Sequence, residues 1–249
     1  MKLKKWFGIT ALAATAVIGL AACGSGKKNT DAKTVKIGVM TKSDSEEKRW
    51  NKIQELLKKD NIKLQFTEFT DYSQPNKAVA DGEVDINAFQ HYYFLNNWNK
   101  ENKQNLVAAA ETYIAPIRLY SGTKNGKNKY TKVSQIPNGA EIAVPNDATN
   151  ESRALNLLQS AGLIKLEKSG NELATVANIK ENPKKLKITE LDASQTARSL
   201  TSVDAAVVNN TFVTEAKIDF KKALFVEPKD KNSKQWFNII AAKKDWEKS

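Results

Sequence analysis

From residue 35 onward, strand-like and helix-like segments alternate along the chain, and this order constrains the fold more than any other feature. Residues 62–69 alternate Ile62, Leu64 and Phe66 with polar side chains, which is typical of a half-buried strand. Residues 45–59 place apolar side chains at helical spacing after two glutamates. The same criteria predict strands at 35–40, 84–89, 141–145, 186–191 and 204–208, and helices at 75–80 and 149–161. This repetition predicts an α/β fold with largely parallel sheets.

Two positions divide this body into predicted lobes. Ala115-Pro116 and Asn209-Asn210 flank a middle block, and the chain returns to its first part afterwards. We therefore expect residues 35–117 together with 210–249 to form lobe 1, and residues 118–209 to form lobe 2. Two crossing segments would join the lobes.

The first 22 residues have the pattern of an export signal. Three lysines precede an apolar stretch at 6–20, and the motif Leu-Ala-Ala-Cys ends at Cys23, the only cysteine of the chain. The apolar stretch is short for a membrane span and polar sequence follows it. The pattern resembles a bacterial lipoprotein signal, which implies a lipid on Cys23 and a place on the extracytoplasmic face of the cell membrane; an ordinary secretory signal is the alternative. Residues 23–34, polar and glycine-bearing, are predicted to form a lipidated tether.

Charge and cysteine content narrow the function classes. Removing residues 1–22 leaves 227 of the 249 residues and lowers the formal net charge from +11 to +8, because that segment holds three lysines and no acid. With no further cysteine, the body has no disulfides and must be stabilised by packing. The lysines are scattered among acids without an aromatic-interleaved basic stripe, so we do not expect nucleic acid as a partner.

Catalytic motifs are missing from the sequence. It contains one histidine, His91, and no serine-hydrolase elbow, zinc-protease motif, phosphate-binding loop or dinucleotide fingerprint. A metal would have to be held by one histidine and scattered carboxylates. We therefore expect a protein that is not an enzyme and that needs no cofactor or metal.

An aromatic cluster is the first candidate for a binding site. Residues 89–94 hold four aromatic rings and His91, directly after a predicted strand. Ligands of open α/β sheets sit outside the carboxyl ends of the strands, so these rings can line a slot for an apolar side chain. Core packing at the start of a helix explains the same pattern equally well.

A second candidate lies where the predicted strand 141–145 turns into a helix. Thr149 or Asn150 can cap this helix, and its free N–H groups together with Arg153 suit a carboxylate. From spacing alone, a surface helix with Arg153 paired to Glu151 or solvent is the commoner arrangement.

Two adjacent asparagines form the third candidate. Asn209 and Asn210 follow the predicted buried strand 204–208. An asparagine there can bind both ends of a zwitterion, because its amide donates to a carboxylate and accepts from an ammonium group. Forming a turn is the commoner role of such residues.

Together these segments resemble the methionine-binding lipoprotein family of the NlpA type. The resemblance is carried by residues 71–76, 84–91, 144–150, 162–166, 181–184, 197–200 and 207–209. It implies an α/β periplasmic-binding-protein fold of type II, in which two α/β lobes enclose a ligand cleft. It also implies capture of L- or D-methionine, or a close relative, by a monomer that delivers the ligand to the membrane subunits of an ABC importer.

The resemblance also implies which residues bind the ligand. The slot for the ligand side chain falls on Tyr72, Phe89, His91 and Phe94, and the positions around the amino-acid backbone fall on Asn150, Arg153, Asn209 and Asn238. The ligand carboxylate would pair with the arginine and the asparagine amides. Its thioether would lie between aromatic rings, which favour sulfur. The histidine would be a neutral, hydrogen-bonding wall.

Several positions depart from the family pattern. Phe94 stands where tyrosine is common, Tyr92-Tyr93 replaces lysine-proline, and Ala115 replaces a bulkier aromatic residue; the sequence also ends at Ser249, before the family's final helical segment. These changes could reshape the slot for another amino acid or a short methionine-containing peptide. The remaining alternative is an envelope interaction lipoprotein without a transport role, which would lack a closed pocket between its lobes.

Overall fold

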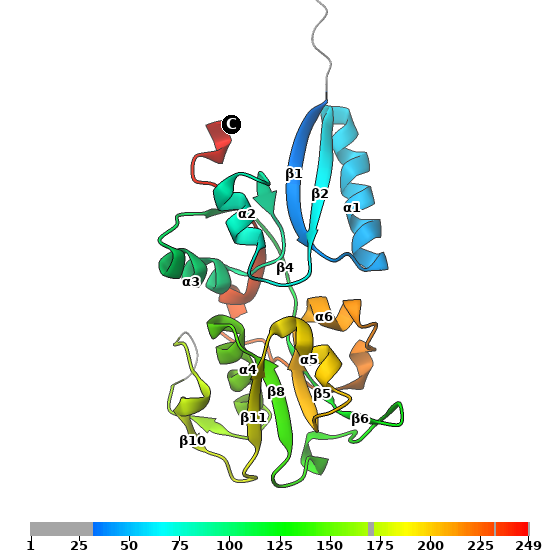
Figure 1. Cartoon of the computed structure of the whole chain (residues 1–249), viewed down its shortest axis with the longest axis vertical. Helices are drawn as coiled ribbons and strands as arrows, with labels where there is room; N and C mark the ends of the chain where they lie inside the picture. The colour runs from blue at the N-terminus through cyan, green and yellow to red at the C-terminus, as the bar shows by residue number, and fades with distance from the viewer. Residues whose placement is uncertain (1–31, 169–171, 232, 249) are drawn as a thin grey trace, which may run out of the picture. The chain divides into compact units, whose positions relative to one another are not determined.

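Two mixed five-stranded sheets, each with helices packed beside it, make up the described part of the chain (Figure 1). The structure is a computed structural model, and it describes residues 32–168, 172–231 and 233–248. The predicted export signal and Cys23 lie outside these residues.

The first sheet has the strand order β2-β1-β3-β14-β4. β1 pairs in parallel with β2 and with β3, whereas β14 is antiparallel to both β3 and β4. The strands are β1 (Lys33–Met40), β2 (Ile62–Phe69), β3 (Ile86–Asn87), β4 (Val107–Ile114) and β14 (Phe237–Ala242), and the accompanying helices are α1 (Asp44–Leu57), α2 (Pro75–Asp81) and α3 (Tyr92–Asn102).

The second sheet has the order β11-β8-β12-β5-β13. β8 pairs in parallel with β11 and β12, and β5 is antiparallel to β12 and β13. The strands are β5 (Arg118–Ser121), β8 (Glu141–Pro145), β11 (Lys187–Leu191), β12 (Ala205–Val208) and β13 (Ala223–Val226), and the helices are α4 (Ala148–Ser160), α5 (Ala193–Ser199) and α6 (Asn210–Glu215). Two short ribbons pair β6 (Thr123–Lys124) with β7 (Lys127–Asn128) and β9 (Lys165–Leu166) with β10 (Ile179–Glu181).

The α/β class is confirmed, but the prediction of largely parallel sheets is wrong. Each five-stranded sheet has two parallel and two antiparallel pairings. A helical crossover within one sheet returns the chain in the same direction and so gives parallel neighbours. β5 and β14 instead enter their sheets directly from the other sheet, so no such crossover sets their direction.

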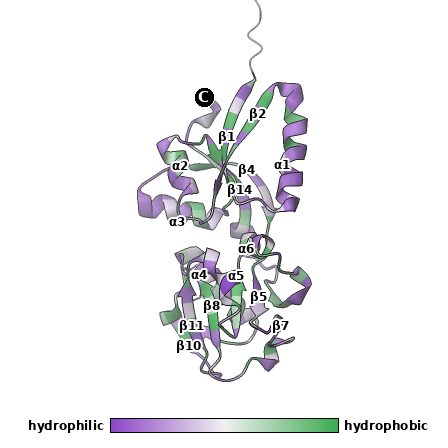
Figure 2. Cartoon of the chain, turned by 45° about the vertical axis from the view of Figure 1, so that its right-hand side comes forward, coloured by the Kyte–Doolittle hydropathy of each residue, from purple (hydrophilic) through white to green (hydrophobic). Residues whose placement is uncertain are grey.

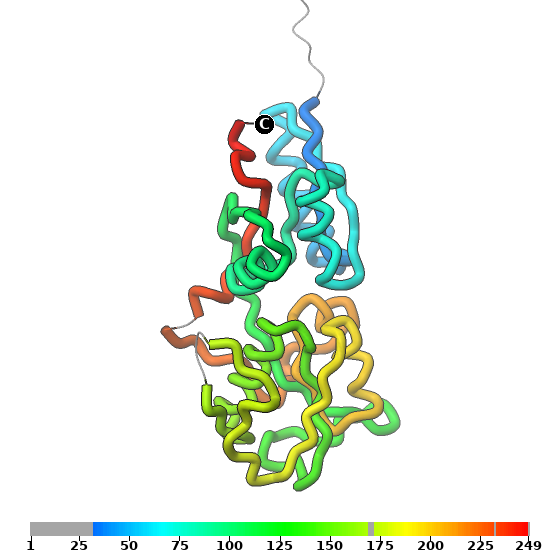
Figure 3. Tube along the Cα trace, turned by 60° about the vertical axis from the view of Figure 1, so that its left-hand side comes forward, coloured from blue at the N-terminus to red at the C-terminus, as the bar shows by residue number. Residues whose placement is uncertain are grey.

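The chain passes between the two sheets twice (Figure 3). The first crossing, residues 115–117, connects β4 to β5, and the second connects β13 to β14 through residues 227–231 and 233–236. The predicted return to lobe 1 at residue 210 differs from the structure, because α6 follows β12 directly and β13 pairs with β5 at the edge of the second sheet. β1 likewise begins at Lys33, inside the predicted tether.

The second lobe has an apolar core between its sheet and α4. The ribbon of β8 is largely in the hydrophobic colour in Figure 2. Leu155 and Leu158 of α4 are fully buried against Ile142 and Val144 of β8. All four residues of β12 are buried, as expected for a central strand covered on both faces. This packing fixes the start of α4 and the exit of β12 relative to each other, and both positions carry predicted site residues.

Contacts also connect the lobes. Met40 at the end of β1 is buried in a cluster with Val208 and Phe212 of the second lobe, and Tyr72 and Phe89 pack against the same cluster. The rings of Tyr72 and Phe212 lie 5.1 Å apart. The lobes are thus in contact beside the carboxyl ends of β1 and β12.

Candidate ligand-binding pocket

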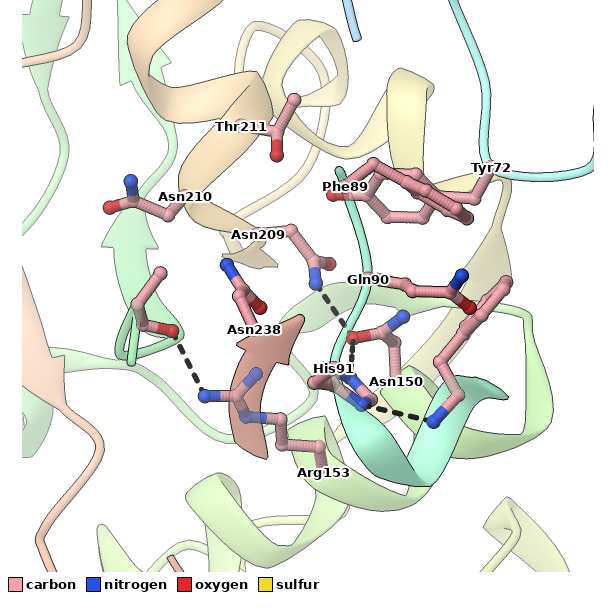
Figure 4. A pocket seen from close by; sticks show the side chains of 12 residues that line it. Tyr72, Phe89, Gln90, His91, Asn150, Arg153, Asn209, Asn210, Thr211 and Asn238 are labelled. Atoms are coloured by element: carbon pink, nitrogen blue, oxygen red, sulfur yellow. Dashed lines mark hydrogen bonds between the residues drawn. The ribbon is translucent and has the colours of Figure 1, made fainter. Parts of the chain in front are cut away.

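A pocket lies between residues of the two lobes (Figure 4). Twelve residues line it, and all eight residues predicted for the site are among them. The lining consists of Tyr72, Phe89, Gln90, His91, Phe94, Ala115, Asn150, Arg153, Asn209, Asn210, Thr211 and Asn238. The structure therefore brings together all of the predicted positions, which come from sequence segments up to 166 residues apart, since Tyr72 and Asn238 are the outermost.

The elements of both sheets present these residues at strand ends. Residues 89–91 follow β3, Phe94 lies in α3, and Asn238 is on β14. On the other lobe, α4 after β8 carries two of the lining residues, and residues 209–211 follow β12 at the start of α6. This is the edge at which open α/β sheets bind ligands.

Aromatic rings form one wall of the pocket. The ring centroids of Phe89 and Phe94 lie 5.6 Å apart at 80°, and Tyr72 lies 5.7 Å from Phe89 and 6.1 Å from Phe94. Burial raises the pKa of the Tyr72 phenol above its usual range, and this residue also interacts with Thr211 of the opposite lobe. The wall is therefore aromatic and uncharged, and Phe94 packs edge-to-face on both of the other rings.

His91 is the N-cap of α3. Its Nδ1 accepts a hydrogen bond from the backbone N–H of Phe94 at 3.0 Å, so the proton of the neutral ring is on Nε2. Nε2 faces Oδ1 of Asn150 at 3.5 Å. Burial, and then the positive charge of Arg153, lowers the pKa of His91 to about 3. The imidazole is thus neutral at physiological pH, and its role toward a ligand stays a prediction.

Asp147, and neither Thr149 nor Asn150, caps helix α4. The Asp147 carboxylate accepts the backbone N–H of Asn150 at 3.0 Å and the hydroxyl of Thr149 at 3.0 Å. It also accepts the side-chain amide of Asn150 through both oxygens, at 3.0 Å each. Asp147, Thr149 and Asn150 are all good capping types, so spacing alone could not choose between them.

This cap fixes which polar atoms face the pocket. Because Asn150 donates its amide to Asp147, its Oδ1 is directed at Asn209, whose Nδ2 donates to it at 2.7 Å. The Asn150 amide group is therefore committed and does not meet a ligand carboxylate in this arrangement. Oδ1 of Asn209 is buried and has no hydrogen-bond partner among the described residues.

Arg153 is buried and ion-paired. Its Nε and Nη2 donate to the two oxygens of Glu227 at 2.6 and 2.5 Å, and Nη2 also donates to the carbonyl of Ala115 at 3.0 Å. The guanidinium carbon lies 4.6 Å from the Trp236 ring. The surface arrangement with Glu151 is excluded, since the Glu151 carboxylate accepts the backbone N–H of Val176 at 3.0 Å instead.

Sequence reasoning missed the residues that hold Arg153 and the loop after β3. Glu227 and Trp236 belong to the second crossing segment, for which no element was predicted. Gln90 is buried and shares hydrogen bonds of 2.5–2.9 Å with the amides of Asn76 and Asn87. The available sequence signal for Gln90 was its place inside the aromatic run at 89–94. Nothing in the sequence indicated Glu227.

Two of the noted departures lie outside the pocket lining. The hydroxyl of Tyr92 donates to Glu111 at 3.0 Å, and Tyr93 packs edge-to-face on Trp236 at 5.4 Å. The prediction that Tyr92 and Tyr93 reshape the slot is therefore wrong as far as direct contact is concerned, because neither residue lines the pocket. Phe94 and Ala115 do line the pocket.

The described residues contain no cluster of three or more His, Cys, Asp and Glu side chains that could hold a metal ion. Within the same ranges, every helix is too short or too polar to cross a membrane.

Two α/β lobes, two crossing segments and a pocket between the lobes define the chain as a periplasmic-binding-protein-like fold. It belongs to the NlpA lipoprotein family, because the sequence model of that family matches residues 35–249.

Named relatives agree with this membership. A probable D-methionine-binding lipoprotein MetQ of Haemophilus influenzae is 41% identical over 98% of this chain and 87% of its own. The substrate-binding protein of a methionine transporter from Streptococcus pneumoniae is 78% identical, with a TM-score of 0.85 over 87% of this chain and 83% of its own. A nutrient-binding protein from Burkholderia cenocepacia, solved bound to methionine, is 38% identical, with a TM-score of 0.77 over 86% and 88% of the two chains.

Proposed function

We propose that this chain is a lipid-anchored, extracytoplasmic substrate-binding protein that captures methionine, in its L or D form, and delivers it to an ABC importer. Cys23 carries the lipid in this proposal and holds the protein at the outer face of the cell membrane. The protein acts as a monomer and binds its ligand without catalysing a reaction. The names of its relatives, which are methionine-binding lipoproteins and a methionine-transporter component, support the proposal.

The observation that carries the proposal is the polarity of the pocket. Figure 4 draws the rings of Tyr72 and Phe89 on one side and the guanidinium of Arg153 on the other. A thioether fits the aromatic side, because each contact between sulfur and a ring contributes about 0.3–1.5 kcal/mol. The backbone of an amino acid fits the polar side.

Two atoms on the polar side are available to an amino-acid backbone. Nη1 of Arg153 donates no hydrogen bond to any residue in the described ranges, so a ligand carboxylate can accept from it. Oδ1 of Asn209 is buried without a partner there, which costs about 1–3 kcal/mol in the absence of a donor. A ligand ammonium group would remove that cost. A ligand that has both a carboxylate to accept and an ammonium group to donate is a zwitterion, such as an amino acid.

The competing role, an envelope interaction lipoprotein without transport, was expected to lack a closed pocket between the lobes. The pocket between the lobes, with its buried histidine and its partnerless asparagine oxygen, argues against that role. No specific observation favours it.

Thermal unfolding of ligand-stripped protein tests the substrate. L-Methionine and D-methionine should raise the melting temperature in a concentration-dependent way, because a ligand that binds only the folded state stabilises it by mass action. A methionyl dipeptide and leucine serve as comparison ligands. Absence of a shift with either methionine enantiomer would refute the assignment, and a shift with the dipeptide alone would replace it.

Labelling of cells with palmitate tests the anchor. The unchanged chain should incorporate label and remain with the membrane fraction, whereas a Cys23→Ser variant should do neither. Labelling of the serine variant would remove Cys23 as the attachment site.

A further inference from the structure

We propose that Glu227 is a positioning and specificity-determining residue of the pocket. It fixes the orientation of Arg153 and offsets its charge, so that the pocket prefers a ligand without net charge. This inference rests on the proposed function, since it concerns how a methionine-like ligand is recognised.

The donors of Arg153 can be counted one by one. A guanidinium has five N–H groups: one on Nε and two on each Nη. Glu227 accepts the Nε–H and one Nη2–H, at 2.6 and 2.5 Å, and the carbonyl of Ala115 accepts from Nη2 at 3.0 Å. Only the two N–H groups of Nη1 remain for a ligand. The face of the guanidinium is covered by Trp236 at 4.6 Å, so the group has no freedom to turn another edge to the pocket.

Glu227 is itself held by both crossing segments. Its backbone N–H donates to the carbonyl of Ile117 at 3.1 Å, and its Oε2 accepts the backbone N–H of Ile117 at 3.3 Å. Its side chain is 12% exposed. The carboxylate is therefore a fixed part of the pocket's support, located where the chain passes between the lobes.

The charge balance of the pocket follows from this pair. Arg153 is the one charged side chain among the twelve lining residues, because His91 is neutral. Its positive charge is already opposed by the Glu227 carboxylate on two of its nitrogens. A ligand that brings only a carboxylate adds a second negative charge to this arginine. A ligand that also brings an ammonium group balances the added charge, and Oδ1 of Asn209 is there to accept from it.

Glu227 should therefore discriminate an α-amino acid from the α-hydroxy acid of the same side chain. The two molecules share the thioether and the carboxylate but differ by the ammonium charge. Without the Glu227 charge, the arginine would bind a lone carboxylate more strongly, and the advantage of the amino acid would shrink.

Calorimetric titration of the Glu227→Gln variant tests this inference. The ligands are L-methionine and 2-hydroxy-4-(methylthio)butanoate, each also titrated into the unchanged chain. The unchanged chain should prefer methionine, and the ratio of the two dissociation constants should fall about tenfold in the variant. A ratio within threefold of that of the unchanged chain would overturn the inference, even if both affinities decreased, because a purely structural role weakens both ligands alike.

A matched control separates a local effect from a change in net charge. Glu181→Gln removes the same charge from an exposed ion pair with Lys165, away from the pocket lining, and should leave the ratio unchanged. An equal fall of the ratio in the control would also overturn the inference. Binding of neither ligand by the unchanged chain would refute the proposed function itself, and the inference with it.

A crystal structure of the unchanged chain with methionine tests the same geometry without a variant, should the glutamine variant not fold. Glu227 should remain on Nε and Nη2 of Arg153, with the ligand carboxylate at Nη1. A ligand carboxylate on the Nε–Nη2 edge, with Glu227 displaced, would overturn the inference.

Discussion

Arg153 of α4 and Glu227 of the second crossing segment form a two-point ion pair, with N–O distances of 2.6 and 2.5 Å. The arginine fork that sequence reasoning assigned to the ligand is therefore occupied by a side chain 74 residues away. Among the described residues, only the Nη1 edge of the guanidinium is left without an acceptor. Arg153 thus has two roles, as a candidate ligand contact and as a link between α4 and both crossing segments.

We predict that Arg153→Ala lowers the free energy of unfolding by about 3 kcal/mol, because it leaves the Glu227 carboxylate buried without its counter-charge. The double variant Arg153→Ala/Glu227→Gln should recover at least about 1 kcal/mol of that loss, since no uncompensated charge remains. Urea denaturation of the three ligand-free proteins measures both values.

Arg49→Ala is the control for this prediction, because Arg49 forms an ion pair with Glu46 at 3.5 Å with 41% of its side chain exposed. It should change the free energy of unfolding by no more than about 1 kcal/mol. Equal stability of Arg153→Ala and the double variant would show that the Glu227 charge is not the source of the cost.

The aromatic wall leads to a second prediction. Phe94→Ala should weaken methionine binding by about tenfold to a hundredfold, because it removes a ring that packs edge-to-face on Phe89 and lines the pocket. Calorimetric titration measures the change. Phe66→Ala removes a ring that packs on Trp50 outside the pocket, and it should reduce stability while leaving affinity within about twofold. Unchanged affinity in Phe94→Ala would remove this ring from the ligand contacts.

Local patterns identified most strands around the site because those strands are either alternating or wholly apolar. β2 alternates in burial over most of its length, and β12 is buried at all four residues. β4 was not predicted, since three consecutive alanines give no strand period. β13 and β14 were also missed, and with them the position of the second crossing.

The identity of the site residues could be predicted from the sequence, but their hydrogen-bond partners could not. Strand ends and the family resemblance located Asn150 and Arg153, and both line the pocket. Which N–H groups of Asn150 and Arg153 remain for a ligand depends on Asp147 and on the distant Glu227, because these two carboxylates accept hydrogen bonds from them. Such long-range partners leave no periodic signal in the sequence, so only the folded chain reveals which donors face a ligand.

A third prediction concerns Glu151, which is buried at the start of α4. Burial raises the pKa of its carboxyl to about 7, and the negative charges of Glu190 and Asp147 raise it as well, against a lowering effect from the Val176 N–H. The folded state thus favours the protonated form more than the unfolded state does. This contribution to stability is complete below about pH 4.5 and is lost as the pH rises through about 7.

The Glu151→Gln variant should therefore become more stable relative to the unchanged chain as the pH rises. The difference in the free energy of unfolding should change by about 1–3 kcal/mol between pH 4.5 and 8. Urea denaturation at several pH values measures the difference between the two proteins. Glu47→Gln, at an exposed position of α1, removes the same charge and is the control for the change of net charge. A difference that stays constant with pH would mean that Glu151 has its ordinary pKa.

The final prediction concerns the protonation of His91, which is the one histidine of the chain and so gives a single set of imidazole signals in ¹⁵N NMR. Nδ1 should appear as an unprotonated acceptor and Nε2 as a protonated donor, because Nδ1 accepts the Phe94 N–H. With its pKa lowered to about 3 by burial and by Arg153, the ring should not titrate between pH 8 and 5. The stability that the neutral ring contributes is present above about pH 6.5 and is lost as the pH falls toward 3. A ring that titrates near pH 6.5 in the folded protein would contradict this, and it would mean that the imidazole is exposed to solvent and not buried.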